Sequence, residues 1–173
     1  MSIEFFYLAD REDALPTIAQ WYFEQWGHLV PDETLERANE RLQSFLNRDR
    51  IPFILVATLG DEIIGAAQLK FREMARLFPD KEHWIGGVYV SRQHRGLGYG
   101  SLIIEEIAAV APRYGVSVLH LQTERLNGGV YARLGWVPTG QAEKFGQQVL
   151  VMERRLDEPV DPSSETTSQT LRD

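Results

Sequence analysis

Three glycines near the middle of the chain follow a strand-like segment and could build a binding site for an anion. They lie in residues 88–101, which read VYVSRQHRGLGYGS. Gly96, Gly98 and Gly100 carry no Cβ, so the backbone can curl closely around a bulky group. An apolar-periodic stretch from Leu102 indicates a helix that begins at this loop, and the first N–H groups of a helix have no intrahelical partners. These N–H groups and the positive end of the helix dipole favour a phosphate group.

Two better-known phosphate loops do not account for this sequence. A P-loop requires Gly-Lys-Ser/Thr, which is absent, and a dinucleotide-binding loop requires G-x-G-x-x-G, whereas this loop reads G-x-G-x-G. What remains is Arg95-x-x-Gly98-x-Gly100, with Arg92 and His94 beside it and no acidic residue between positions 91 and 101. Glycine-rich turns before helices are common, so the loop alone also permits a purely structural role.

Asn127 and Tyr131 form a second group that could do chemistry. They are four residues apart on a predicted short helix over residues 127–134, so they share one face of it. A phenol with a pKa of about 10 is protonated at neutral pH and can act as a general acid. The alternative is that Asn127 caps the helix and Tyr131 is a half-buried aromatic.

A third feature is the pair Gly86-Gly87 inside the strand that precedes the glycine loop. Glycine weakens a strand, and it often marks a β-bulge or a place where another backbone approaches closely. We therefore expect an irregularity in this strand.

Together these motifs resemble the GNAT N-acetyltransferases over about residues 51–156. The resemblance rests on Arg95-x-x-Gly98-x-Gly100 after a strand, and on Tyr131-x-x-x-Gly135-Trp136 about thirty residues later. It implies that the loop binds the pyrophosphate of acetyl-CoA, that Asn127 bonds the pantetheine arm and that Tyr131 protonates the departing thiolate. It also implies that the cofactor pairs with exposed strand backbone. The cofactor-binding residues expected on this basis are Val88, Val90, Arg95, Gly96, Leu97, Gly98, Tyr99, Gly100, Ser101 and Asn127.

The resemblance also implies a mixed α/β fold. We expect a central, mostly antiparallel sheet of six to seven strands with one parallel, splayed pair, flanked by about four helices. Periodicity and turn residues predict strands over 3–8, 52–59, 62–71, 84–90, 116–123, 136–143 and 147–156, and helices ending near 26 and over 34–47, 98–111 and 127–134. Asp10 and Asp13 are expected to cap the first helix, and Asp32 or Thr34 the second.

Residues 1–156 are expected to form this one domain, and residues 157–173 a disordered acidic tail. The tail holds five acids and one base, so most of the net charge of −7 falls on it. The remaining charge argues against a nucleic-acid surface. The chain has no apolar run long enough for a membrane span and no signal peptide at residues 1–10, so we expect a cytoplasmic protein without a membrane partner. A homodimer is left open.

The expected reaction is acetyl transfer from acetyl-CoA to a primary amine of a small molecule. The chain has no cysteine, so a cysteine acyl-enzyme is excluded, and direct attack in a ternary complex is the simpler interpretation. The family resemblance favours Glu82 as the base, with His83 and Asp80 as alternatives, although a solvated loop charge is the simpler interpretation. Tyr89, Glu124 and His120 are weaker candidates. No metal is expected, because His28 and His94 lack a ligand partner at useful spacing. The alternative functions are acetylation of a protein N-terminus or lysine, and non-catalytic acyl-CoA binding.

Overall fold

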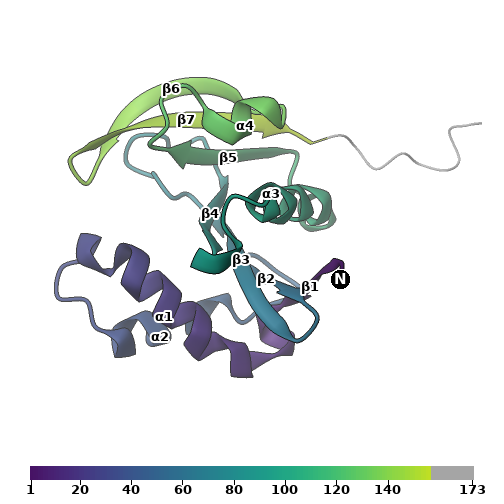
Figure 1. Ribbon diagram of the computed structural model, residues 1–173. Helices are drawn as coiled ribbons and strands as arrows, with labels where there is room; N and C mark the ends of the chain where they lie inside the picture. Colours follow the sequence, from purple (N-terminus) through teal and green to yellow (C-terminus); the bar gives the residue numbers. More distant parts are fainter. Residues whose placement is uncertain (157–173) are drawn as a thin grey trace, which may run out of the picture.

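A computed structural model, which describes residues 1–156, arranges seven strands in one sheet with the order β1-β2-β3-β4-β5-β7-β6 (Figure 1). The expected acidic tail at residues 157–173 lies outside the described residues. The strands are β1 (Ile3–Tyr7), β2 (Phe53–Leu59), β3 (Glu62–Phe71), β4 (His83–Val90), β5 (Val118–Thr123), β6 (Val137–Lys144) and β7 (Gln147–Arg155). The helices are α1 (Leu15–Trp26), α2 (Leu35–Leu42), α3 (Tyr99–Val110) and α4 (Gly129–Arg133).

The sheet is antiparallel except between β4 and β5. In the described chain this parallel pairing is limited to one register pair, Trp84 with His120, near the start of β4. The two strands therefore separate toward the carboxyl end of β4, where the glycine loop begins. Figure 1 shows β5, β6 and β7 at the top of the view, apart from β1–β3. The expected mixed sheet with one splayed parallel pair is confirmed.

A bulge lies in β4 beside this separation, as the glycine pair predicts. In the pairing with β3, Gly86 stands opposite Gln68 and Tyr89 opposite Ala66, so two β4 residues face one β3 residue. Gly87 has φ +53°, in the left-handed region that favours glycine. Its carbonyl accepts a hydrogen bond from the hydroxyl of Tyr22 on α1, at 2.7 Å. Burial raises the pKa of this hydroxyl, so it keeps the proton that it donates.

The hydrophobic core has two main parts, one on each face of the sheet. Successive strand residues point to opposite faces, so β2 contributes Ile54 and Val56 to one part and Leu55 and Ala57 to the other. The first part packs against α1 and α2, and the second packs against α3. This arrangement explains why residues 53–57 are a continuous apolar run rather than an alternating one.

The N-terminal caps of the helices agree only partly with those predicted from the sequence. The side chain of Thr34 accepts the N–H of Arg37 at 3.1 Å and caps α2, which is one of the two expected caps. The expected caps Asp10 and Asp13 are wrong for α1. That helix follows two short 3₁₀ turns, over residues 8–10 and 12–14, and starts after Ala14 without a side-chain cap. The turn that contains Asp13 runs directly into the helix, so this residue lies too early to cap it. No helix in residues 1–156 is both long enough and apolar enough to span a membrane.

The bulge leads to a stability prediction with an internal control. A Cβ at Gly87 would lie 2.8 Å from the Tyr22 hydroxyl and 2.9 Å from Gln68, whereas a Cβ at Gly115, where φ is +78°, would meet nothing within 4 Å. Both alanine substitutions incur left-handed strain of about 1–2 kcal/mol. We expect Gly87→Ala to lose about 1–3 kcal/mol more than Gly115→Ala, because only Gly87→Ala overpacks its surroundings. Urea unfolding measures the difference, and equal losses would contradict a tightly held bulge.

Candidate active site

Two residues in the left-handed region build the loop between β4 and α3. Gly96 has φ +77° and Gly98 has φ +88°, conformations that strain any side chain. A Cβ at either position would meet no heavy atom within 4 Å beyond its chain neighbours, so this side of the loop is open. The first hydrogen bond of α3 runs from the N–H of Leu102 to the carbonyl of Gly98, at 3.3 Å. The N–H groups just before Leu102 therefore have no intrahelical acceptor and are free for a ligand.

Two basic residues of the loop, Arg95 and His94, are held by Val90 of β4 and by Ser91. The Arg95 Nε donates to the Val90 carbonyl at 2.8 Å, and its guanidinium lies 5.1 Å from the centre of the Tyr89 ring. The His94 Nδ1 lies 2.6 Å from the Ser91 hydroxyl, which closes the short turn over residues 92–94. Arg95 thus occupies a backbone group of Val90 that we expected the cofactor to meet.

Asn127 and Tyr131 line one cavity of about 700 Å³ at the end of β5. The Asn127 Oδ1 accepts the N–H of Gly129, the first residue of α4, at 3.0 Å, while its Nδ2 group remains a potential donor. The Tyr131 ring meets the Trp136 ring edge to face, with 6.4 Å between their centres. Burial raises the pKa of Tyr131, so the phenol is protonated at neutral pH.

Residues of β4, α3 and α4 lie on a single face of the sheet. Val88, Val90, Tyr99 and Tyr131 all pack against the buried cluster that α3 forms with the sheet. The strand end, the start of α3 and the tyrosine that we expected to share a cofactor site therefore lie on the same side of the sheet.

The comparisons with known proteins agree with this geometry. Residues 15–136, well over half of the chain, match the model of the Acetyltransferase (GNAT) family. The chain belongs to the GNAT family. It is therefore an acyltransferase by family. No curated protein matches it in sequence.

Solved GNAT structures share the fold at low sequence identity. The protein yncA from Salmonella typhimurium, solved with its cofactor acetyl-CoA, has a TM-score of 0.68 and 19% identity, covering 95% of this chain and 99% of that one. An aminoglycoside 6'-N-acetyltransferase complexed with coenzyme A has a TM-score of 0.68 and 13% identity, covering 93% and 100%. Aminoglycoside 6'-acetyltransferase type Ii has a TM-score of 0.68 and 14% identity, covering 92% and 100%. At such identities the likeness establishes the fold.

Glu82, the expected GNAT base, lies away from the loop. It directly precedes β4, at the opposite end of that strand from Gly96 and Gly98, and its side chain is exposed. Its carboxylate is 3.8 Å from the guanidinium of Arg72, and its carbonyl accepts the Arg72 N–H at 2.8 Å. Glu82 does not line the cavity that contains Asn127 and Tyr131.

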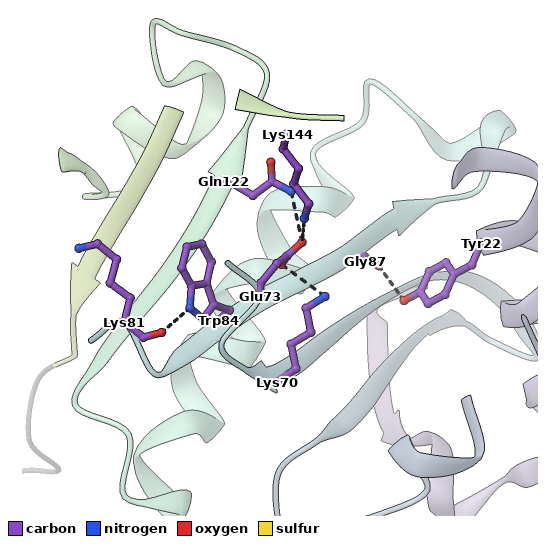
Figure 2. A network of polar contacts seen from close by, with 8 residues as sticks. All are labelled: Tyr22, Lys70, Glu73, Lys81, Trp84, Gly87, Gln122 and Lys144. Atoms are coloured by element: carbon purple, nitrogen blue, oxygen red, sulfur yellow. Dashed lines mark hydrogen bonds and ion pairs between the residues drawn. The ribbon is translucent and has the colours of Figure 1, made fainter. Parts of the chain in front are cut away.

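Sequence reasoning missed a buried carboxylate nearer the bulge. Glu73, from the connection between β3 and β4, is bound by Lys144 at 2.5 Å, Gln122 at 3.2 Å and Lys70 at 3.3 Å (Figure 2). Burial opposes its ionisation, but the charges of Lys70 and Lys144 and the hydrogen bonds outweigh burial and lower the pKa of Glu73.

Strand β4 leaves space for the side chains around Glu73 at Gly86. A Cβ at Gly86 would lie 2.9 Å from the Lys70 Nζ and 3.1 Å from a Glu73 oxygen. Gly86 was therefore the one sequence signal for the network, but it gives no information about which side chains fill the space. Across residues 1–156, no group of three or more His, Cys, Asp or Glu residues could hold a metal ion.

The loop geometry predicts opposite effects of two substitutions at Gly100. This residue is helical, and a Cβ there would lie 3.7 Å from a methyl group of Val90, an ordinary contact. We expect Gly100→Ala to retain coenzyme A binding. Gly100→Asp should abolish it, because a carboxylate would meet the phosphate, although the acid should stabilise the helix start. Thermal shift and calorimetry with coenzyme A test both variants. Normal binding by Gly100→Asp would show that the loop is not the phosphate site.

Proposed function

We propose that this GNAT protein is an acetyl-CoA-dependent N-acetyltransferase that acts on a primary amine of a small molecule. The observation that carries the proposal is the gap where β4 leaves β5 after one parallel pair, with the open glycine loop at the end of the same strand. A long thin ligand with a pyrophosphate at one end matches this combination of an unpaired strand edge and a set of free N–H groups.

The binding mode follows from the groups that are free to make hydrogen bonds. The pyrophosphate lies against the N–H groups of residues 96–101, and the pantetheine arm runs along β4 beside Val88. The Asn127 Nδ2 donates to an amide carbonyl of that arm while its Oδ1 continues to accept the Gly129 N–H. The thioester then lies near the Gly87 bulge and the Tyr131 hydroxyl.

The chemical step is direct attack of the amine on the thioester carbonyl. The nitrogen forms the new bond to carbon, the carbon–sulfur bond breaks, and the thiolate takes the Tyr131 proton. The ammonium proton must leave the nitrogen, and Glu82 is the proposed acceptor. Glu82 lies about five residues before the bulge, or roughly 15 Å along an extended strand. The proton therefore reaches Glu82 through water, which its exposed side chain permits.

Tyr131 and Asn127 separate catalysis from binding. Tyr131→Phe keeps the ring and removes the proton donor, so kcat should fall while coenzyme A affinity stays nearly unchanged. Loss of a general acid costs about 10²–10⁴-fold, and we expect the low end because water can substitute. Asn127→Asp keeps an acceptor for the Gly129 N–H but loses the amide donor, so it should mainly raise the KM for acetyl-CoA. Steady-state kinetics with acetyl-CoA varied checks both variants, and full turnover in Tyr131→Phe would assign Tyr131 to packing.

The proton path through Glu82 predicts a defect that depends on pH. Glu82→Gln should slow turnover most where the amine is largely protonated. The loss there should be up to roughly 10²-fold, the lower end of the range for removal of a general base. The defect in turnover should shrink as pH rises through the pKa of the amine, because a neutral amine depends less on a base to remove a proton. A pH–rate profile of wild type and variant with one accepted amine measures this. A defect that is equal at every pH would remove Glu82 from the proton path.

A further inference from the structure

The Glu73 network holds more positive than negative charge in a largely buried place. The side chains of Lys144, Lys70 and Glu73 are 22%, 24% and 11% exposed. Within residues 1–156, the carboxylate of Glu73 is the only ion-pair partner found for either lysine. Two ammonium groups therefore share one carboxylate, and one unit of positive charge is left over. Figure 2 shows Glu73 between the two lysines, with Gln122 on the same side as Lys144.

The network lies between two cavities next to the bulge. Glu73, Gln122 and Lys144 line a cavity of about 450 Å³, while Lys70 and Gly87 line another of about 300 Å³. Trp26 and Val30 line both cavities. The two strands β4 and β5 separate beside the bulge, and Gln122 belongs to β5. The surplus charge therefore faces the end of the gap where the proposed function places the thioester.

The surplus charge favours an anion in the larger cavity. A partly buried cation that lacks a full partner is costly, and an anion brought by a ligand relieves that cost. Glu73 itself is a poor base, because its pKa is lowered, so its part is to hold the two ammonium groups in place. Glu124, another acid of the larger cavity, is exposed, so water screens its charge. In the smaller cavity Glu33 pairs with Arg41, and their charges cancel.

We propose that the acceptor is an amino acid or a similar compound that carries both the reacting amine and a carboxylate, and that Lys144 binds this carboxylate in the larger cavity, while Lys70, on the other oxygen of Glu73, adds its charge from the side of the smaller cavity. This inference rests on the proposed function and names its substrate class. The apolar walls made by Trp26, Val30 and Val149 receive an apolar side chain. Acceptors with several positive charges, such as polyamines and aminoglycosides, are repelled by the two lysines.

Paired substrates test the carboxylate directly. Thiol release from acetyl-CoA is measured with L-methionine and L-phenylalanine, with their carboxamides, with the corresponding decarboxylated amines, and with spermidine and kanamycin. We expect kcat/KM for the amino acids to exceed that for the carboxamides by about 10–100-fold, the range expected for hydrogen bonds to a charged group. Equal use of amino acid and carboxamide, or a preference for spermidine or kanamycin, would overturn the inference.

A matched pair of variants assigns the effect to the network. Lys144→Met removes the charge and keeps most of the apolar stem, so it should raise the KM for amino acids about tenfold or more and leave the carboxamides unchanged. Lys81→Met is the control, because Lys81 is also largely buried, at 20% exposure, but pairs with Glu153 and lines neither cavity. It should keep the preference for carboxylates. Retention of the preference in Lys144→Met would contradict the proposed role of this residue.

A binding measurement separates this inference from the proposed function. Calorimetry compares N-acetyl-L-methionine with its carboxamide, in wild type and in Lys144→Met, in the presence of coenzyme A. Binding that needs both the carboxylate and Lys144, without turnover of any amine, would uphold the anion site and refute the N-acetyltransferase. Turnover of amines without any preference for carboxylates would uphold the N-acetyltransferase and refute the anion site.

Discussion

The hydrogen bond from Tyr22 to the Gly87 carbonyl fixes the geometry on which both sides of the site depend. It joins α1 to the one irregular place in β4, where two residues stand opposite one on β3. Without a bulge, β4 would continue to alternate regularly, and its backbone groups would reach β5 in the ordinary parallel pattern. With the bulge, the strand changes its twist and leaves an unpaired edge. The loop that follows places its free N–H groups at the end of the same strand.

The bulge also divides the chemistry between the faces of the sheet. Beyond it, Val88 and Val90 join the α3 face together with Tyr131, which is the side of the departing thiol in the proposed function. Tyr89 turns to the other face, where it stacks on Trp21 of α1 with 4.8 Å between ring centres, and Arg95 lies over the same Tyr89 ring. Gly86 and Gly87 leave room on this face for Lys70, Glu73 and Tyr22. One stretch of strand thus borders both the proposed cofactor side and the proposed acceptor side.

The order of the elements, the glycine loop and the bulge could be predicted from the sequence because they depend on local patterns. Apolar runs and alternating apolar residues between turn residues mark the strands. Glycine marks the backbone that only glycine adopts easily, as at Gly87, Gly98 and Gly135. The Glu73 network could not be predicted in this way. Its members come from β3, the 72–82 connection, β5 and β6, and only the strand order places them together. The return of Arg95 onto the Val90 carbonyl also depends on the shape of a turn that the sequence does not specify.

The position of β6 as an edge strand of the sheet has a consequence for association between copies of the chain. An edge strand has unpaired backbone groups to which another chain can add a strand, and proteins oppose this with proline, charge and irregular pairing. β6 carries Pro138, which offers no N–H group, and its pairing with β7 shifts register between Pro138 and Gly140. At the opposite margin, β1 is only five residues long. Both ends of the sheet thus resist continuation into a second copy, so any association between copies would rely on side-chain surfaces rather than on a shared sheet.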